Sequence, residues 1–151
     1  MWKVFFSHIP SEDFRIRYNK PMHPTLHQLT TALQKSWSKD TSIWADKLPS
    51  DNPAHGQCVV SALVVQDYLG VNLLRVHAVG DGINENHYYN ILDDGTTVDT
   101  TGFQYKVAVS LSPSPVDLSK GGYSTMRERL QDDEDTLRRY KLLRQHVDNI
   151  I

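Results

Sequence analysis

Cys58 is the only cysteine of the 151-residue chain, and it lies where a loop gives way to a helical pattern. The loop reads Asn-Pro-Ala-His-Gly-Gln over residues 52–57, and an apolar run follows to Leu69. A thiol in the first turn of a helix lies near the positive end of the helix dipole, which favours the reactive thiolate. The unpaired N–H groups of that turn can also hold an oxyanion. Lone cysteines are also often small buried hydrophobes, so position alone leaves both interpretations open.

Two further residues, His87 and Asp99, have the chemistry to activate such a thiol. A nucleophilic thiol works best beside a base, and the base beside a group that orients it. His87 opens a predicted strand over residues 87–92, and Asp99 lies near the end of a predicted strand over residues 96–100. The structural alternatives are a strand histidine bonded to a backbone carbonyl and an aspartate that caps the next turn. Because aspartate is unfavourable in strands, a specific role for Asp99 is slightly favoured.

The turn at residues 93–95, Asp-Asp-Gly, decides whether His87 and Asp99 can meet. A two-residue turn pairs Asp99 with Asn90 and leaves His87 on the other face of the sheet. A three-residue turn places Asp99 opposite Tyr89, which shares a face with His87, so that the two become diagonal neighbours. Asp-Asp-Gly supplies the residues that a three-residue turn prefers, and we therefore expect this form, with the two-residue form as the alternative.

Helices and strands that would position these residues follow from the pattern of apolar side chains. Thr25 is a plausible N-cap for a helix that ends near Ser38, and residues 39–57 form a long connection. The Cys58 helix is apolar on most sides and has a stop signal at Gly70. After it we predict a strand over residues 71–79, a polar loop over 80–86, and a loop over 112–122.

Towards the C-terminus, Ser124 opens a predicted short helix with Glu128 in its first turns. The acidic cluster at residues 132–135 ends this helix and starts another, because carboxylates are favoured at a helix N-terminus. A metal site at the cluster is the weaker alternative. The last helix carries an apolar stripe of Leu137, Tyr140, Leu143 (or Arg144) and Val147.

Length and composition are those of one globular domain. We expect residues 1–24 to form an N-terminal arm and residues 25–151 to form the core. The arm includes a predicted short edge strand over residues 2–6. The net charge of −2 and the lack of a Lys/Arg cluster give no reason to expect nucleic acid. There is no 18-residue apolar segment, so we expect a cytoplasmic protein with no membrane partner. A single cysteine excludes an internal disulfide.

The chain resembles the transglutaminase-like branch of the papain-like superfamily in three places: Gly56-Gln57-Cys58 opening a helix, residues 87–90 (His-Tyr-Tyr-Asn) in a strand, and Val98-Asp99 in the next. Over residues 26–148 it more closely resembles the bacterial YunG family. The matching pieces of this second resemblance are Asn52-Pro53, Gly56-Gln57-Cys58, residues 61–67, His87-Tyr88, Asn90, Asp94-Gly95, Asp99-Thr100, Gln104 and Arg139-Tyr140.

The resemblance implies an α+β fold with a papain-like/transglutaminase-like core, in which the nucleophile helix packs on a small antiparallel sheet with further helices at both ends. It also implies Cys58 as nucleophile, His87 as general base and acid, and Asp99 as orienter. The cross-linking activity of animal transglutaminases is not implied, because Val59 stands where they carry tryptophan and the chain is far shorter.

We therefore expect a cysteine-dependent amide-bond hydrolase or acyltransferase, such as a peptidase, deamidase or amidase. Its substrate would be a peptide, a protein or a small amide, and it would need no cofactor and no metal. Four residues are candidates for holding the oxyanion or the substrate, namely Gln57, Asn52, Trp44 and Asn90. His55 and His77 are rival bases ranked below His87.

Two other functions remain open from the sequence. One is a non-catalytic module that uses the same scaffold to bind a ligand or peptide. The other is a metal-dependent hydrolase built on His77, His87 and Asp99. His23 and His27 are four residues apart, but Pro24 separates them and no acidic partner follows, so they are expected to be surface residues.

Overall fold

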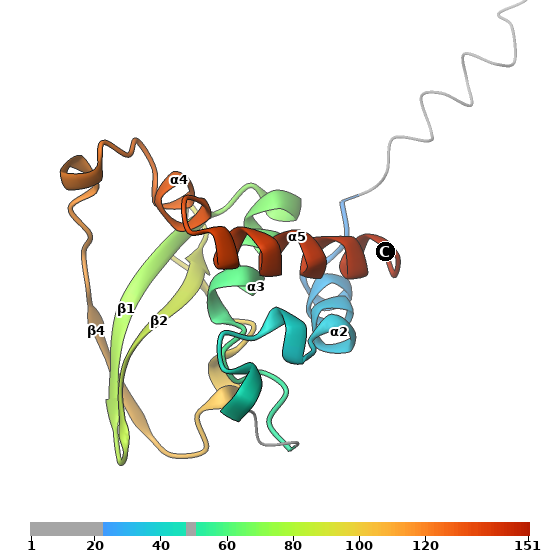
Figure 1. Cartoon of the computed structure of the whole chain (residues 1–151), viewed down its shortest axis with the longest axis horizontal. Coiled ribbons are helices and arrows are strands. Elements are labelled where there is room, and N and C mark those ends of the chain that lie inside the picture. The colour runs from blue at the N-terminus through green and yellow to red at the C-terminus, as the bar shows by residue number, and fades with distance from the viewer. Residues whose placement is uncertain (1–22, 48–50) are drawn as a thin grey trace, which may run out of the picture.

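The computed structural model describes residues 23–47 and 51–151, which combine helices with one small antiparallel sheet, as expected of an α+β protein (Figure 1). The sheet has four strands in the order β3-β2-β1-β4. The strands are β1 (Asn72–Gly80), β2 (Ile83–Ile91), β3 (Thr97–Val98) and β4 (Val109–Pro113). The helices are α2 (Leu26–Ser36), α3 (Cys58–Leu69), α4 (Met126–Gln131) and α5 (Glu134–Asp148), with short 3₁₀ turns η1 (Lys39–Thr41), η2 (Ala45–Lys47), η3 (Gly102–Gln104) and η4 (Leu118–Gly121).

Helix α3 lies between the sheet and the other helices (Figure 1). Six consecutive residues of α3, 60–65, are buried, as predicted from the continuous apolar run. Gly56 turns the chain into the helix with φ +75°, and a Cβ there would lie only 2.8 Å from Trp44 Cδ1. Gly70 ends the helix in the left-handed conformation, with its N–H bonded to the Gln66 carbonyl. The predicted start and stop of this helix are confirmed.

Helices α2 and α5 pack against each other, and α5 also packs on α3. They share an apolar core with α3 that includes Leu29, Leu33, Leu143 and Val147. The predicted N-cap of α2 is confirmed by a capping box. The Thr25 hydroxyl accepts from the Gln28 N–H, and the Gln28 side chain accepts from the Thr25 N–H, so these two backbone N–H groups at the start of the helix are satisfied.

Two predictions about the C-terminal helices need correction. The N-cap of α4 is Thr125 rather than Ser124. The buried stripe of α5 consists of Thr136, Arg139, Leu143 and Val147, whereas Leu137 and Tyr140 are only half-buried. The acidic cluster does restart the chain as a helix, since the Asp133 carboxylate caps α5 by accepting from the Thr136 N–H.

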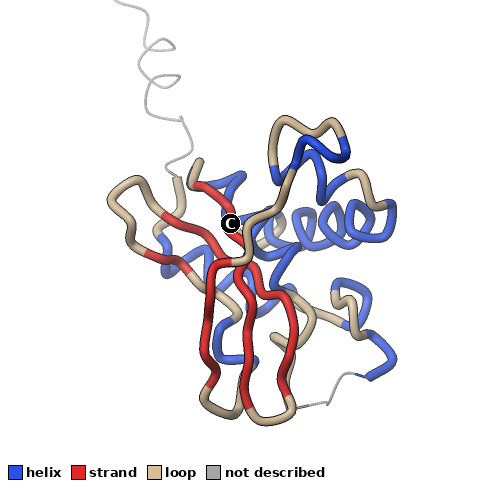
Figure 2. The backbone as a smooth tube through the Cα atoms, turned by 90° about the vertical axis from the view of Figure 1, so that its left-hand side faces the viewer, coloured by secondary structure: helices blue, strands red, loops and turns tan. Residues whose placement is uncertain are grey.

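The hairpin of β1 and β2 is longer than the sequence pattern predicted. We expected a loop over residues 80–86, but Gly80 pairs with Ile83 and only residues 81–82 form the turn. Strand β4 was not predicted, and its last residues, 112–113, fall in the segment expected to be a loop. β4 is defined by its antiparallel pairing with β1, which Figure 2 shows beside it.

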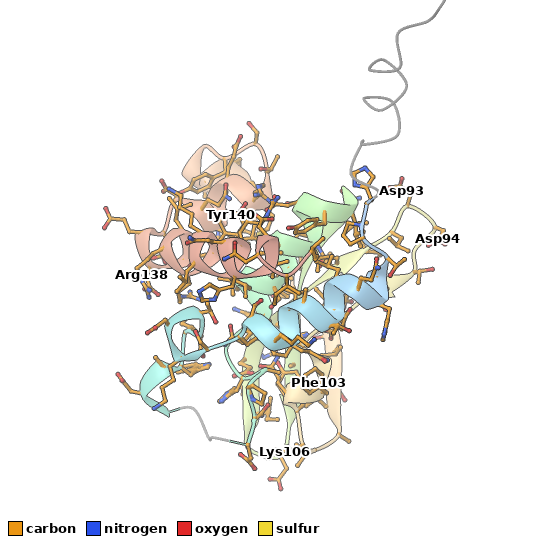
Figure 3. The ribbon with its side chains drawn as sticks, turned by 90° about the vertical axis from the view of Figure 1, so that its right-hand side faces the viewer. Asp93, Asp94, Phe103, Lys106, Arg138 and Tyr140 are labelled. Atoms are coloured by element: carbon orange, nitrogen blue, oxygen red, sulfur yellow. The ribbon has the colours of Figure 1, made fainter. Side chains whose placement is uncertain are left out.

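The turn between β2 and β3 has the three-residue form that the sequence favoured. Ile91 pairs with Thr97, and the Leu92 N–H donates to the Thr96 carbonyl at 2.8 Å. Figure 3 shows Asp93 and Asp94 at the tip of this turn. The regular strand is shorter than predicted, covering only Thr97–Val98 instead of residues 96–100.

The predicted edge strand over residues 2–6 and nearly all of the predicted N-terminal arm lie outside the described residues. Within residues 23–47 and 51–151, no helix is long and apolar enough to cross a membrane.

Candidate active site

His87 lies in the middle of β2 and is completely buried. Because Val76 of β1 is its pairing partner, both side chains lie on the same face of the hairpin. The ring of Tyr105 meets the imidazole edge-on at a centroid distance of 5.3 Å, and the Tyr89 ring lies 6.1 Å away. The imidazole is therefore held in one orientation by packing as well as by its polar contacts.

Asp99 follows β3 directly and reaches the imidazole as the three-residue turn requires. One carboxylate oxygen, Oδ2, lies 2.7 Å from His87 Nε2. The other oxygen, Oδ1, accepts from the Thr101 N–H at 3.2 Å. Gly102 packs against this carboxylate so closely that a Cβ there would lie 2.7 Å from Oδ2. The backbone after β3 thus fixes the position of the carboxylate.

Cys58 is the first residue of α3 and is half-buried. As the first helical residue it presents a backbone N–H that has no partner within the helix. Its side chain lies close enough to His87 to be one of the groups that raise the pKa of the imidazole. The structure therefore places His87 and Asp99 in direct contact, with Cys58 near the same imidazole, and these three residues are called the cluster below.

The electrostatics of this cluster favour a charged imidazole. Burial of the ring lowers the pKa of His87, but the hydrogen bonds and charges of Asp99 and Cys58 together outweigh burial and raise the pKa from 6.5 to about 9. Hydrogen bonds and opposite charges raise a histidine pKa because they stabilise the protonated form.

Two residues that contact the imidazole, Gln104 and Tyr105, were given no role from the sequence. Gln104 is nearly buried, and its Nε2 lies 3.2 Å from His87 Nδ1. Tyr105 follows it, and burial together with the Glu85 carboxylate raises the pKa of the tyrosine. The only feature of the sequence that could have pointed to a role for either residue is that Gln104 is among the residues of the YunG resemblance.

The four residues predicted to bind the oxyanion or the substrate make contacts of their own in the structure. Trp44 has an exposed side chain whose ring stacks on His55 at 6.3 Å. The other three donate their side-chain amides to backbone carbonyls: Gln57 to Ser38 at 2.9 Å, Asn52 to Gln104 at 2.8 Å, and Asn90 to Ala62 at 3.0 Å. Asn52 thereby ties the loop before Cys58 to the turn that carries Gln104.

The rival base His77 lies elsewhere. His77 is next to Val76 on β1 and therefore projects from the opposite face to His87, where its Nε2 lies 2.7 Å from Asn84 Oδ1. His77, His87 and Asp99 thus do not meet as the metal alternative requires. Among residues 23–47 and 51–151, no group of three or more His, Cys, Asp or Glu side chains is arranged to hold a metal ion.

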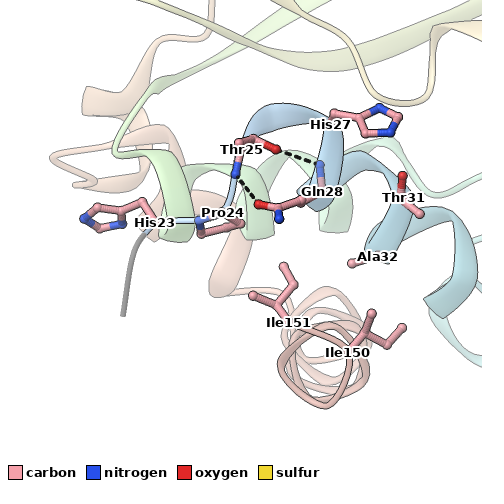
Figure 4. A pocket seen from close by; sticks show the side chains of 9 residues that line it. All are labelled: His23, Pro24, Thr25, His27, Gln28, Thr31, Ala32, Ile150 and Ile151. Atoms are coloured by element: carbon pink, nitrogen blue, oxygen red, sulfur yellow. Dashed lines mark hydrogen bonds between the residues drawn. The ribbon is translucent and has the colours of Figure 1, made fainter. Parts of the chain in front are cut away.

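A separate cavity of about 650 Å³ lies between the start of α2 and the C-terminal end of the chain (Figure 4). His23 and His27 line it together with Ile150 and Ile151. The two histidines are exposed, as predicted, and Figure 4 shows their rings at different edges of the cavity. None of its lining residues belongs to the Cys58 cluster.

The fold and the cluster define a small α+β protein in which a buried strand histidine contacts an aspartate that follows the adjacent antiparallel strand and lies near a cysteine at a helix N-terminus. A family model described as "YunG protein" matches residues 25–151, and the chain belongs to the YunG family. It is similar to a protein of Bacillus subtilis (strain 168) named "Uncharacterized protein YunG", with 28% identity over 110 residues, which is 72% of this chain and 87% of that protein. No solved structure matches the chain.

Proposed function

We propose that the chain is a cysteine-dependent amide-bond hydrolase or acyltransferase with a transglutaminase-like, papain-like core. The observation that carries this proposal is the direct contact of His87 Nε2 with Asp99 Oδ2 at 2.7 Å, beside a Cys58 that is one of the groups raising the pKa of the same imidazole. The order along the chain, cysteine on a helix and then histidine and aspartate on neighbouring antiparallel strands, is the order of that superfamily.

In the proposed reaction, the Cys58 thiol gives its proton to His87 Nδ1 and the sulfur attacks a carbonyl carbon. The oxyanion lies near the backbone N–H of Cys58, at the positive end of α3. His87 then protonates the leaving amine, and water or an acceptor amine resolves the thioester. Asp99 keeps the other imidazole proton on Nε2 and stabilises the charged ring.

Substrates of this chemistry are peptides, proteins or small amides. An amide must receive a proton on its leaving nitrogen, and the imidazolium of His87 is the group placed to supply it. Neither the reaction nor the site requires a cofactor, because the nucleophile, base and orienter are all side chains of this chain.

The proposal is tested by looking for an acyl group on Cys58. The protein is mixed with p-nitrophenyl acetate, and the release of nitrophenol is followed while peptide mapping by mass spectrometry locates the acetyl group. We expect a burst of nitrophenol, an acetyl group on Cys58 and continued turnover. Cys58→Ser and His87→Ala remove both the burst and the turnover, whereas the matched histidine control His77→Ala retains them.

A protein that only binds a ligand on the same scaffold would give no burst and no turnover above that of a free thiol peptide. That result in the wild-type protein would refute catalysis at Cys58.

A further inference from the structure

A second pocket, with a volume of about 320 Å³, lies on the sheet and has had no role so far. Its lining is mostly apolar and includes Leu74, Val76, Tyr89, Leu111 and Met126. Ligand pockets run from about 300 to 1,000 Å³, so this one is at the small end of the range. It has room for one side chain or a short alkyl chain rather than for a large ligand.

Strand pairing places this pocket on the same face of the sheet as His87. Val76 pairs with His87, and Leu74 pairs with Tyr89 two residues further along the hairpin. Paired residues share a face, as do residues two apart along a strand, and a two-residue step covers about 7 Å. Tyr89 lines the pocket, whereas Tyr88, which projects from the opposite face, does not. The pocket therefore begins about one such step from the imidazole.

Two residues join the pocket to the imidazole. The Tyr89 ring centroid lies 6.1 Å from that of His87, and Tyr89 also lines the pocket. Val76 lines the pocket and is the pairing partner of His87. Two other lining residues, Leu74 and Leu111, are 38% and 46% exposed, so the pocket is reached from solvent.

The lining favours an uncharged occupant. Of the described residues that line the pocket, only Arg75 is charged. Its guanidinium donates to the backbone carbonyls of Ser114 at 3.0 Å and Pro115 at 3.2 Å, so this charge is already engaged. A charged group on the occupant would lose its water without gaining a partner, whereas each methylene that is buried tightens binding about fourfold.

We propose that this pocket is a subsite for an uncharged apolar group attached to the amide that lies at His87. A leucine-sized side chain or a short alkyl chain on that amide reaches from the imidazole into the pocket. The substrates are then amides with such a group next to the scissile bond, and not amides flanked by charged groups. Cleavage of these amides rests on the proposed function, whereas their binding in the pocket does not.

Binding is measured by NMR in Cys58→Ser protein, so that no thiol reacts. The signals followed are the ¹³C-labelled methyl group of Met126, which lines the pocket, and the ring of His87. The probes are acetamide, hexanamide with its chain on the acyl side, and N-butylacetamide with its chain on the amine side. We expect at least one of the two longer amides to shift both signals, with a dissociation constant about tenfold or more below that of acetamide. Equal affinity for all three amides, or a shift of Met126 without a shift of His87, overturns the proposal.

A charge placed in the pocket should weaken this binding. Leu111→Glu, added to the Cys58→Ser protein, should raise the dissociation constant of the longer amide about tenfold or more. The matched control is Val79→Glu, because Val79 is an exposed residue next to Ala78, the pairing partner of Leu111, and so projects from the opposite face. It should leave the affinity unchanged, and equal effects of the two substitutions overturn the proposal.

The comparison of the three amides needs no substitution in the pocket, so it decides the proposal even where Leu111→Glu does not fold. It also separates the two proposals. If the wild-type protein gives no burst with p-nitrophenyl acetate, the proposed function fails, while the amide titrations still decide whether the pocket binds an apolar group beside His87.

Discussion

Replacing Asp99 by asparagine should change how the stability of the protein depends on pH. The pKa of His87 is 6.5 in an unfolded chain and about 9 in the fold. Because the folded protein holds this proton more tightly, the resulting stabilisation is fully present below pH 6.5 and is lost as the pH rises through 9. The difference corresponds to about 3 kcal/mol at 1.36 kcal/mol per pH unit. Without the carboxylate, one of the two groups that raise this pKa is lost, so the pKa of His87 should fall.

The assay is urea unfolding at pH 6.5 and pH 9.5. The wild-type protein should lose more stability than Asp99→Asn on going from the lower to the higher pH, by up to about 3 kcal/mol. Comparing the two proteins removes the contributions of other titrating groups. Asp93→Asn is the matched control, since it makes the same charge change at an exposed turn residue. If Asp99→Asn and wild type lost stability in parallel, the coupling of His87 to Asp99 would be refuted.

Three other substitutions probe the supports of the site. Gly102→Ala should push the Asp99 carboxylate away, because the new Cβ would lie 2.7 Å from it; the pKa of His87 measured by NMR should fall, and an unchanged value would contradict this geometry. Asp67→Asn removes the carboxylate that joins α3 to two arginines of α4 and α5, with ion-pair distances of 2.6 and 2.7 Å; urea unfolding should show a loss of about 2 kcal/mol with Cys58 alkylation unchanged. Thr25→Ala should cost about 1 kcal/mol in the same unfolding assay, and no loss would mean that the capping box contributes nothing.

The sequence predicted those elements whose structure is set by local chemistry. The buried helix from Cys58 follows from its continuous apolar run and from the glycines that bound it. The register of β2 and β3 follows from Asp-Asp-Gly at residues 93–95, and it brings Asp99 to His87 as predicted. The N-cap of α2 at Thr25 was likewise a local signal.

The elements that were missed depend on pairing and tertiary contact. The start of β2 is polar, with exposed Asn84 and Asn86, and resembles a loop until it pairs with β1. β4 contains two serines and ends in Pro113, so that only its pairing with β1 makes it a strand. Gln104 reaches His87 from a 3₁₀ turn, and nothing in its local sequence marks that contact.

The central claim, that Cys58 is a nucleophile activated by His87, is tested most directly by alkylation of the intact protein with iodoacetamide near neutral pH. Labelling of Cys58 is followed by mass spectrometry in the wild-type protein, in His87→Ala and in His77→Ala. The account predicts rapid labelling in the wild type and in His77→Ala, with labelling in His87→Ala slowed to that of an ordinary thiol of the same exposure. Equal rates in the wild type and His87→Ala would contradict it.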